Sequence, residues 1–170
     1  MRVLRRISVI FAALLFLTGC ASSDDGFSAS DIGFAEMMIP HHQQAIEMSD
    51  LALERASNAE VLALAEQIKA AQAPEIETMS SWPGVNAGAH SGHMMDGMLT
   101  EEEMQQLRTS SGTQFDRLFL EGMIKHHQGA VMMASGVQDS TNAEVAELAR
   151  AIIAAQEEEI RAMEELLSRL

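Results

Sequence analysis

The chain of 170 residues carries 25 acidic and 11 basic side chains, which gives a formal net charge of −14. This acidity argues against nucleic acid as a partner, because phosphates would be repelled, and it favours cations. The single cysteine, Cys20, excludes disulfides and multi-thiolate metal sites within the chain. The length predicts one domain, and a composition rich in methionine and poor in aromatic residues favours a helical core over a sheet.

The first nineteen residues are typical of a bacterial secretory signal. Three arginines precede an apolar run over 7–17, which is too short to span a membrane as a mature anchor. The run ends in Leu17-Thr18-Gly19-Cys20, which resembles the lipobox of lipoproteins. We therefore expect residues 1–19 to be removed and a lipid on Cys20 to hold the protein to the membrane on its extracytoplasmic side. A plain signal peptide with an incidental cysteine is the alternative.

Residues 20–30 are small, polar and acidic, which predicts a flexible tether between the lipid and the domain. The domain, 31–170, repeats one pattern twice. The phrase Met38-Ile39-Pro40-His41-His42-Gln43 returns as Met123-Ile124-Lys125-His126-His127-Gln128, and the flanking positions also match. A repeat over roughly 34–79 and 119–163 predicts two copies of one structural unit, 31–80 and 113–170.

Each copy contains two predicted helices. Apolar residues at steps of three and four predict a helix over about 31–56, which Pro40 is expected to kink. A capping box at Ser57-Asn58-Ala59-Glu60 predicts the start of the second helix. The corresponding helix of the second copy is predicted over about 113–137, and Thr141-Asn142-Ala143-Glu144 predicts the start of the last one. The sequence thus predicts an all-α, four-helix bundle built from two repeated helix hairpins.

A linker over 81–112 joins the two hairpins. It is interrupted by glycines and a proline, and a capping box at Thr100–Glu103 predicts one short helix within it. Glycines at seven-residue spacing in the third long helix (Gly122, Gly129 and Gly136) predict the close approach of a partner helix. Three tolerated glycines in a weak helix are the alternative.

The paired histidines face or flank the core in the helical projection, with methionines before and after them. The second helix of each copy adds polar residues where core residues are expected, and burying a carboxylate costs several kcal/mol unless it is paired. If the first hairpin turns near Ser57, Gln72 lies level with His42, and Glu75 lies level with Met38 or Ile39. The predicted metal ligands on the helices are Met38, His41, His42, Met48, Glu75 and Met79 in the first copy and Met123, His126, His127, Met133, Glu159 and Met163 in the second. A histidine–glutamate hydrogen bond in a metal-free core is the alternative.

The linker carries a second, looser set of predicted ligands, whose alternative is a flexible loop that binds nothing. This set is His90, His93, Met94, Met95 and Met98. Imidazole and thioether donors suit Cu(I), so copper is the predicted ion, with zinc or iron as alternatives. We expect two equivalent, half-buried sites on the helices and one mobile site in the linker.

Catalysis has little support in the sequence. A ferritin-type di-iron centre uses Glu-x-x-His, whereas Glu36 and Glu121 precede His41 and His126 by five residues. The chain also lacks a phosphate-binding loop and a serine or cysteine nucleophile constellation. A metal-dependent redox enzyme is therefore the weaker alternative, and no enzymatic activity is assigned.

The His-His-Gln phrase, followed by Ala and Met on a hairpin that ends in Ala-Gln, Glu-Ile and Met, resembles the bacterial secreted family called domain of unknown function 305. The resemblance covers about 31–168, and it departs from the pattern at Pro40, where the second copy has Lys125. It implies a ferritin-like fold, one or two copies of the unit, and a link to copper handling. The leading hypothesis is a lipid-anchored extracytoplasmic protein that binds, buffers or passes copper. A non-catalytic structural or interaction module of the cell envelope is the alternative, and the sequence indicates no protein partner.

Overall fold

The computed structural model describes residues 26–170, so the predicted signal sequence, Cys20 and most of the predicted tether lie outside the described residues. The regular secondary structure of these residues is all helix, without strands, which confirms the predicted fold class. Its helices are α1 (Ala29–Arg55), α2 (Ala59–Ser81), α3 (Glu101–Thr109), α4 (Gly112–Ser135) and α5 (Ala143–Leu167). None of these helices is both long and apolar enough to cross a membrane.

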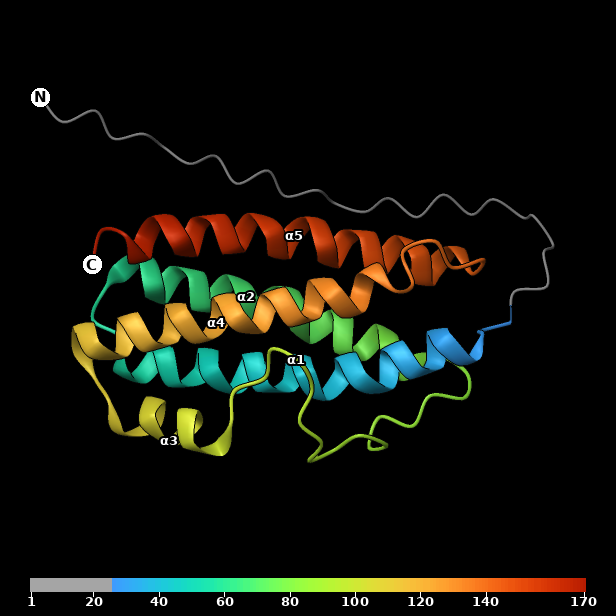
Figure 1. Cartoon of the computed structure of the whole chain (residues 1–170), viewed down its shortest axis with the longest axis horizontal. Helices are drawn as coiled ribbons and strands as arrows, with labels where there is room; N and C mark the ends of the chain where they lie inside the picture. The colour runs from blue at the N-terminus through green and yellow to red at the C-terminus, as the bar shows by residue number, and fades with distance from the viewer. Residues whose placement is uncertain (1–25) are drawn as a thin grey trace, which may run out of the picture.

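The four long helices lie side by side as two hairpins, and the short α3 lies against one end of the bundle (Figure 1). α1 packs along α2, and α4 packs along α5. The two hairpins meet chiefly through α1 and α4, while α3 contacts both of these helices. The helices that carry the paired histidines are therefore neighbours at the centre of the bundle.

The predicted capping box at the start of α2 is wrong by one residue. Asn58 is the N-cap, and its side chain accepts a hydrogen bond from the amide of Glu60 at 2.8 Å. Ser57 is not free to cap, because its hydroxyl donates to the carboxylate of Asp116 on α4 at 2.6 Å. A contact with the other hairpin thus determines where this helix begins.

The start of α5 shows the same shift. Asn142, not Thr141, accepts hydrogen bonds from the backbone amides of Glu144 and Val145, at 3.0 and 3.3 Å. The predicted capping box at Thr100, by contrast, is confirmed at the start of α3. α1 continues through Pro40 without interruption, although the proline leaves the helix one amide short.

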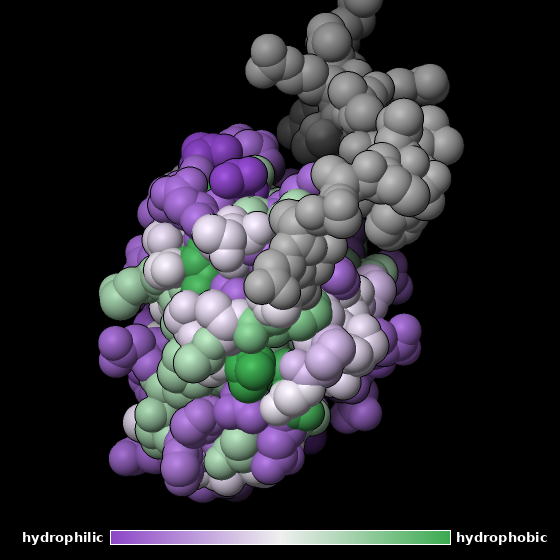
Figure 2. Space-filling model, turned by 90° about the vertical axis from the view of Figure 1, so that its right-hand side faces the viewer, coloured by the Kyte–Doolittle hydropathy of each residue, from purple (hydrophilic) through white to green (hydrophobic). Residues whose placement is uncertain are grey.

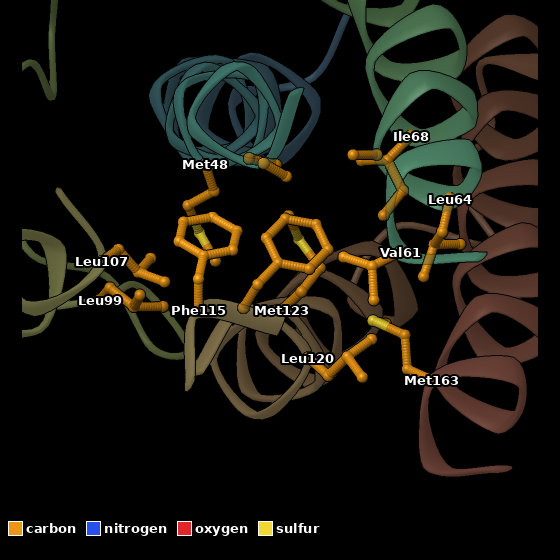
Figure 3. Close-up of a cluster of buried hydrophobic side chains, with 14 of the residues drawn as sticks. Met48, Val61, Leu64, Ile68, Leu99, Leu107, Phe115, Leu120, Met123 and Met163 are labelled. Carbon is orange, nitrogen blue, oxygen red and sulfur yellow. The ribbon is translucent and has the colours of Figure 1, made fainter. Parts of the chain in front are cut away.

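The core consists of two apolar clusters separated along the bundle. Figure 3 shows the first cluster, in which Met48 points from α1 towards α4, and Leu99 and Leu107 pack from the linker and α3. The second cluster includes Phe34 and Trp82. Each of the four long helices contributes to both clusters, so each must cross the level between them.

The prediction that a partner helix packs closely on the glycines of α4 holds only in part. A Cβ atom added at Gly129 would overlap the backbone carbonyl of Asp96 in the linker. One added at Gly122 would lie 3.0 Å from the side chain of Leu99 in the linker and 3.4 Å from Cε of Met48 on α1. Gly136 lies beyond the helix as its C-cap.

The end of the bundle at which α1 begins and α4 joins α5 mixes hydrophilic residues with small hydrophobic spots (Figure 2).

Candidate metal centre

A layer of polar side chains lies between the two apolar clusters. On every long helix the polar residues fall, in sequence, between residues of one cluster and residues of the other. The layer consists of His41 and His42 on α1, Gln72 and Glu75 on α2, His126 and His127 on α4, and Gln156 and Glu159 on α5. The sequence repeat therefore places two equivalent sets of donors at one level of the bundle.

The outer histidines form the same contact in both hairpins. Nε2 of His42 lies 2.8 Å from a carboxylate oxygen of Glu75, and Nε2 of His127 lies 2.7 Å from one of Glu159. Both imidazoles are fully buried, whereas each glutamate side chain is 19% exposed. The histidine–glutamate pair considered from the sequence is thus present twice.

The predicted register of the first hairpin was about one turn off. Glu75 was expected beside Met38 or Ile39, but its carboxylate reaches His42. The physical reason is that side chains of an α-helix lean towards its N-terminus. In an antiparallel hairpin this tilt carries the tip of Glu75 further along α1.

The inner histidines meet across the boundary between the hairpins. The ring centroids of His41 and His126 are 3.7 Å apart, with an angle of 42° between the ring planes. Nε2 of His126 donates to the backbone oxygen of His41 at 2.9 Å, and Nε2 of His41 donates to that of Asp96 at 3.2 Å. Both rings are completely buried, so the expected separate, half-buried pockets are not found. The two inner rings form one shared contact.

These partners define the tautomer of the four rings. A carbonyl or carboxylate oxygen accepts hydrogen bonds, so in a neutral ring Nε2 carries the proton and Nδ1 carries a lone pair. All four Nδ1 atoms are buried and have no hydrogen-bond partner. A buried acceptor without a partner is costly, and a neutral imidazole with a free nitrogen is the form that binds metals.

Burial keeps the inner pair neutral. Loss of hydration lowers the pKa of His41 to about 3, with a further contribution from the neighbouring His42. The same desolvation holds the pKa of His126 well below its ordinary value, and the proximity of His41 adds to the effect. At neutral pH both inner rings therefore offer a lone pair without first having to release a proton.

Other groups in the bundle core share this lack of partners. Both amide atoms of Gln72 and of Gln156 are buried and unpaired, and so is the hydroxyl of Ser49. The sequence indicated the two glutamines through their place in an apolar stripe. Ser49 was missed, and only its position one residue after Met48 in the helical pattern could have indicated that it is buried.

The predicted methionine ligands flank the polar layer on both sides. Met38 and Met79 belong to the second apolar cluster, and Met133 packs against it. Met48, Met123 and Met163 belong to the first cluster, where Figure 3 shows their sulfur atoms among apolar carbon. All of them thus contribute to packing, and their role as ligands stays a prediction.

The described residues contain no group of three or more His, Cys, Asp or Glu side chains positioned to hold one ion. The described layer brings its imidazoles and carboxylates together in pairs.

The linker brings two of its predicted ligands into contact. Nδ1 of His90 and Nδ1 of His93 lie 3.3 Å apart. Met94 is 58% exposed, while Met95 and Met98 are half-buried. A groove of about 400 Å³ lies between the linker, α1 and α3; its lining includes Pro40, Gln44, His93, Met94, Met98 and Met104. The linker set is thus accessible, in contrast to the buried layer.

The family model called domain of unknown function (DUF305) matches residues 31–167. This chain belongs to the DUF305 family. A comparison with functionally curated proteins gave no match. Among solved structures, a DUF305 fragment from Deinococcus radiodurans is 34% identical with a TM-score of 0.76, and the alignment covers 85% of this chain and 99% of that one.

Two further solved structures extend this comparison. A candidate secreted DUF305 protein from Streptomyces coelicolor is 36% identical, with a TM-score of 0.73 and coverage of 86% of this chain and 95% of that one. CopM in its Cu(II)-bound form is 38% identical, with a TM-score of 0.71 and coverage of 82% and 96%. CopM has also been solved with Cu(I) and with silver. Structural relatives of this DUF305 chain therefore include a copper-binding protein.

Proposed function

We propose that this DUF305 protein is an extracytoplasmic copper-binding protein, anchored by a lipid on Cys20, that buffers copper or passes it on. The observation that carries the proposal is the state of the four buried histidines. Each ring is oriented by an oxygen at Nε2, and each leaves Nδ1 without a partner. Histidines that bind metals commonly show this arrangement, in which the second ring nitrogen donates to a carboxylate or a carbonyl.

The choice of copper rests on the donors around these rings. Methionines flank the polar layer on both sides, and thioethers select soft ions such as Cu(I). CopM, which is more than a third identical to this chain and shares its fold, has been solved with Cu(I), Cu(II) and silver. The accessible pair His90 and His93 would supply a weaker site, because a linker must lose conformational freedom on binding.

One observation favours a structural module of the envelope instead. The paired histidines are completely buried and already hydrogen-bonded through Nε2, which is also what core residues need. In this alternative the four Nδ1 atoms would be an energetic cost without a function. A direct titration separates the two hypotheses.

The test is calorimetric titration of the mature chain with Cu(I), Cu(II), Zn(II) and Fe(II). We expect tight binding of Cu(I) that weakens at least tenfold in the double variant His41→Ala/His126→Ala. The control is Gln128→Ala, which alters the exposed residue that follows His127 in the same motif. Circular dichroism must show that both variants keep their helices. Unchanged Cu(I) binding in a folded double-histidine variant would contradict the assignment of the layer as the tight site.

A further inference from the structure

The linker crosses the bundle as a strap, which we define as residues 96–99. At one end, the side-chain amide of Gln44 on α1 makes two hydrogen bonds with the backbone of Leu99. Its oxygen accepts from the Leu99 amide at 2.7 Å, and its nitrogen donates to the Leu99 carbonyl at 2.9 Å. A glutamine that uses both halves of its amide on one residue fixes that residue firmly.

At the other end, the strap lies directly on the backbone of α4. Gly97 has a φ of 86°, and a Cβ atom there would lie 2.8 Å from the carbonyl oxygen of Lys125 and 2.9 Å from Cα of Gly129. Glycine at both positions allows this approach. Gln44 and Gly129 occupy equivalent positions of the two sequence copies. The strap therefore contacts both copies at the same position, through side-chain hydrogen bonds at Gln44 and through close backbone packing at Gly129.

The strap also covers the inner histidines. The carbonyl of Asp96 accepts the hydrogen bond from Nε2 of His41, and His41 in turn accepts from His126. The strap forms one wall of the groove through Met98 and Leu99, and His93 of the preceding linker also lines it. Pro40 and Gln44, on either side of His41 in the chain, line this same groove. The strap thus stands between accessible donors and buried ones.

We propose that the strap gates the inner histidine pair: a Cu(I) ion bound by the imidazole and thioether groups of the groove reaches His41 and His126 when the strap lifts. This proposal rests on the proposed function for its cargo, but the gate itself can be tested without metal. The buried pair has full protection only while Asp96 and Leu99 stay docked. Weakening the two hydrogen bonds of Gln44 should therefore expose His41.

The first test measures modification of histidines by diethylpyrocarbonate in the metal-free mature chain, with each site read by peptide mass spectrometry. We expect Gln44→Ala to speed modification of His41 about tenfold, since it removes two hydrogen bonds from the closed state. Gly129→Ala should act in the same direction, because its Cβ would overlap the Asp96 carbonyl. The control Gln128→Ala changes an exposed glutamine on α4 and should leave the rate unchanged.

The second test follows Cu(I) exchange with a competing chelator in the same variants. We expect faster uptake and release in Gln44→Ala and Gly129→Ala, with the same number of ions bound. If His41 modification and Cu(I) exchange both keep wild-type rates in the folded variants, the gate is wrong and copper binding still stands. Faster modification with unchanged exchange would also overturn the gate, because the ion would then take another route. If the wild-type chain binds no Cu(I), the proposed function fails.

Discussion

The imidazole of His126 donates to the backbone carbonyl of His41 at 2.9 Å, so the two repeats touch at the same position of their shared motif. The reverse contact does not exist, since Nε2 of His41 donates to Asp96 of the linker instead. Two residues that are equivalent in sequence therefore have different environments. The outer pairs, His42 with Glu75 and His127 with Glu159, keep the symmetry that the inner pair loses.

Protonation of the inner histidines should destabilise the metal-free fold. Burial lowers the pKa of His41 to about 3, far below the ordinary value of 6.5, so the unfolded chain binds protons more readily. Above a pH of about 6.5 His41 is neutral in both states and does not change the free energy of unfolding. As the pH falls from about 6.5 towards 3, the unfolded state takes up a proton that the folded state does not, so the free energy of unfolding decreases. We expect the free energy of unfolding from urea titrations to fall between pH 7 and pH 5. Replacing His41 with Gln should flatten this dependence; an equally steep fall in that variant would contradict the assignment.

The two histidine–glutamate pairs should contribute equally to stability because their geometry is repeated. Glu75→Ala and Glu159→Ala each leave a buried imidazole N–H without its acceptor, which costs about 1–3 kcal/mol. We expect the two losses, measured by urea unfolding, to agree within about 0.5 kcal/mol. Glu77→Ala and Glu157→Ala, at exposed positions of the same helices, are the controls and should change stability little. A large difference between the two hairpins would show that the pairs are not equivalent.

Asp116 should be essential for the turn between α1 and α2. Its buried carboxylate accepts hydrogen bonds from the amide and hydroxyl of Ser57 and from the amide of Asn58, at 2.9, 2.6 and 3.1 Å. Asp116→Ala removes all three and should lower the free energy of unfolding by about 2–3 kcal/mol. Ser57→Ala removes only the hydroxyl contact and should cost less. Equal losses in the two variants would mean that the backbone amides find other acceptors.

Two helical glycines should respond oppositely to alanine. Gly33 on α1 has open space where a Cβ would stand, so Gly33→Ala should raise stability by about 0.5–1 kcal/mol through helix propensity. Gly129→Ala gains the same propensity, but its Cβ would overlap the Asp96 carbonyl, and we expect a net loss of about 1–3 kcal/mol. Thermal unfolding of the two variants measures the contrast. Stabilisation by Gly129→Ala would show that the strap is loosely held.

The helices could be predicted from the sequence because their apolar spacing and caps are local signals. The predicted helix over about 31–56 compares with α1 at Ala29–Arg55, and the short helix after Thr100 was also predicted. The caps at Ser57 and Thr141 were wrong, since each is followed directly by an asparagine that caps instead. For Ser57 the competing contact with Asp116 is tertiary, and no local pattern reveals it.

The candidate site could be predicted only in part. The repeat indicated which histidines and glutamates face inward. The structure pairs His42 with Glu75, which is the histidine–glutamate hydrogen bond that the sequence offered as an alternative to a metal site. The contact between His41 and His126 depends on how two hairpins dock, which periodicity does not determine. The sequence predicts only a linker where the strap lies, because a glycine-rich segment has no helical or strand periodicity. The signals of the strap were indirect: the glycines at seven-residue spacing on α4, and a glutamine, Gln44, in one copy where the other copy has Gly129.

The polar layer also determines how the helices are aligned along the bundle. Apolar clusters alone tolerate sliding, because one methionine or leucine replaces another at little cost. If one hairpin slid by a turn against the other, His126 would lose the carbonyl of His41, and the donors of the layer would enter apolar surroundings. The four histidines therefore also exclude misaligned packings. Polar residues at this level would help the chain fold into a single structure whether or not an ion binds there.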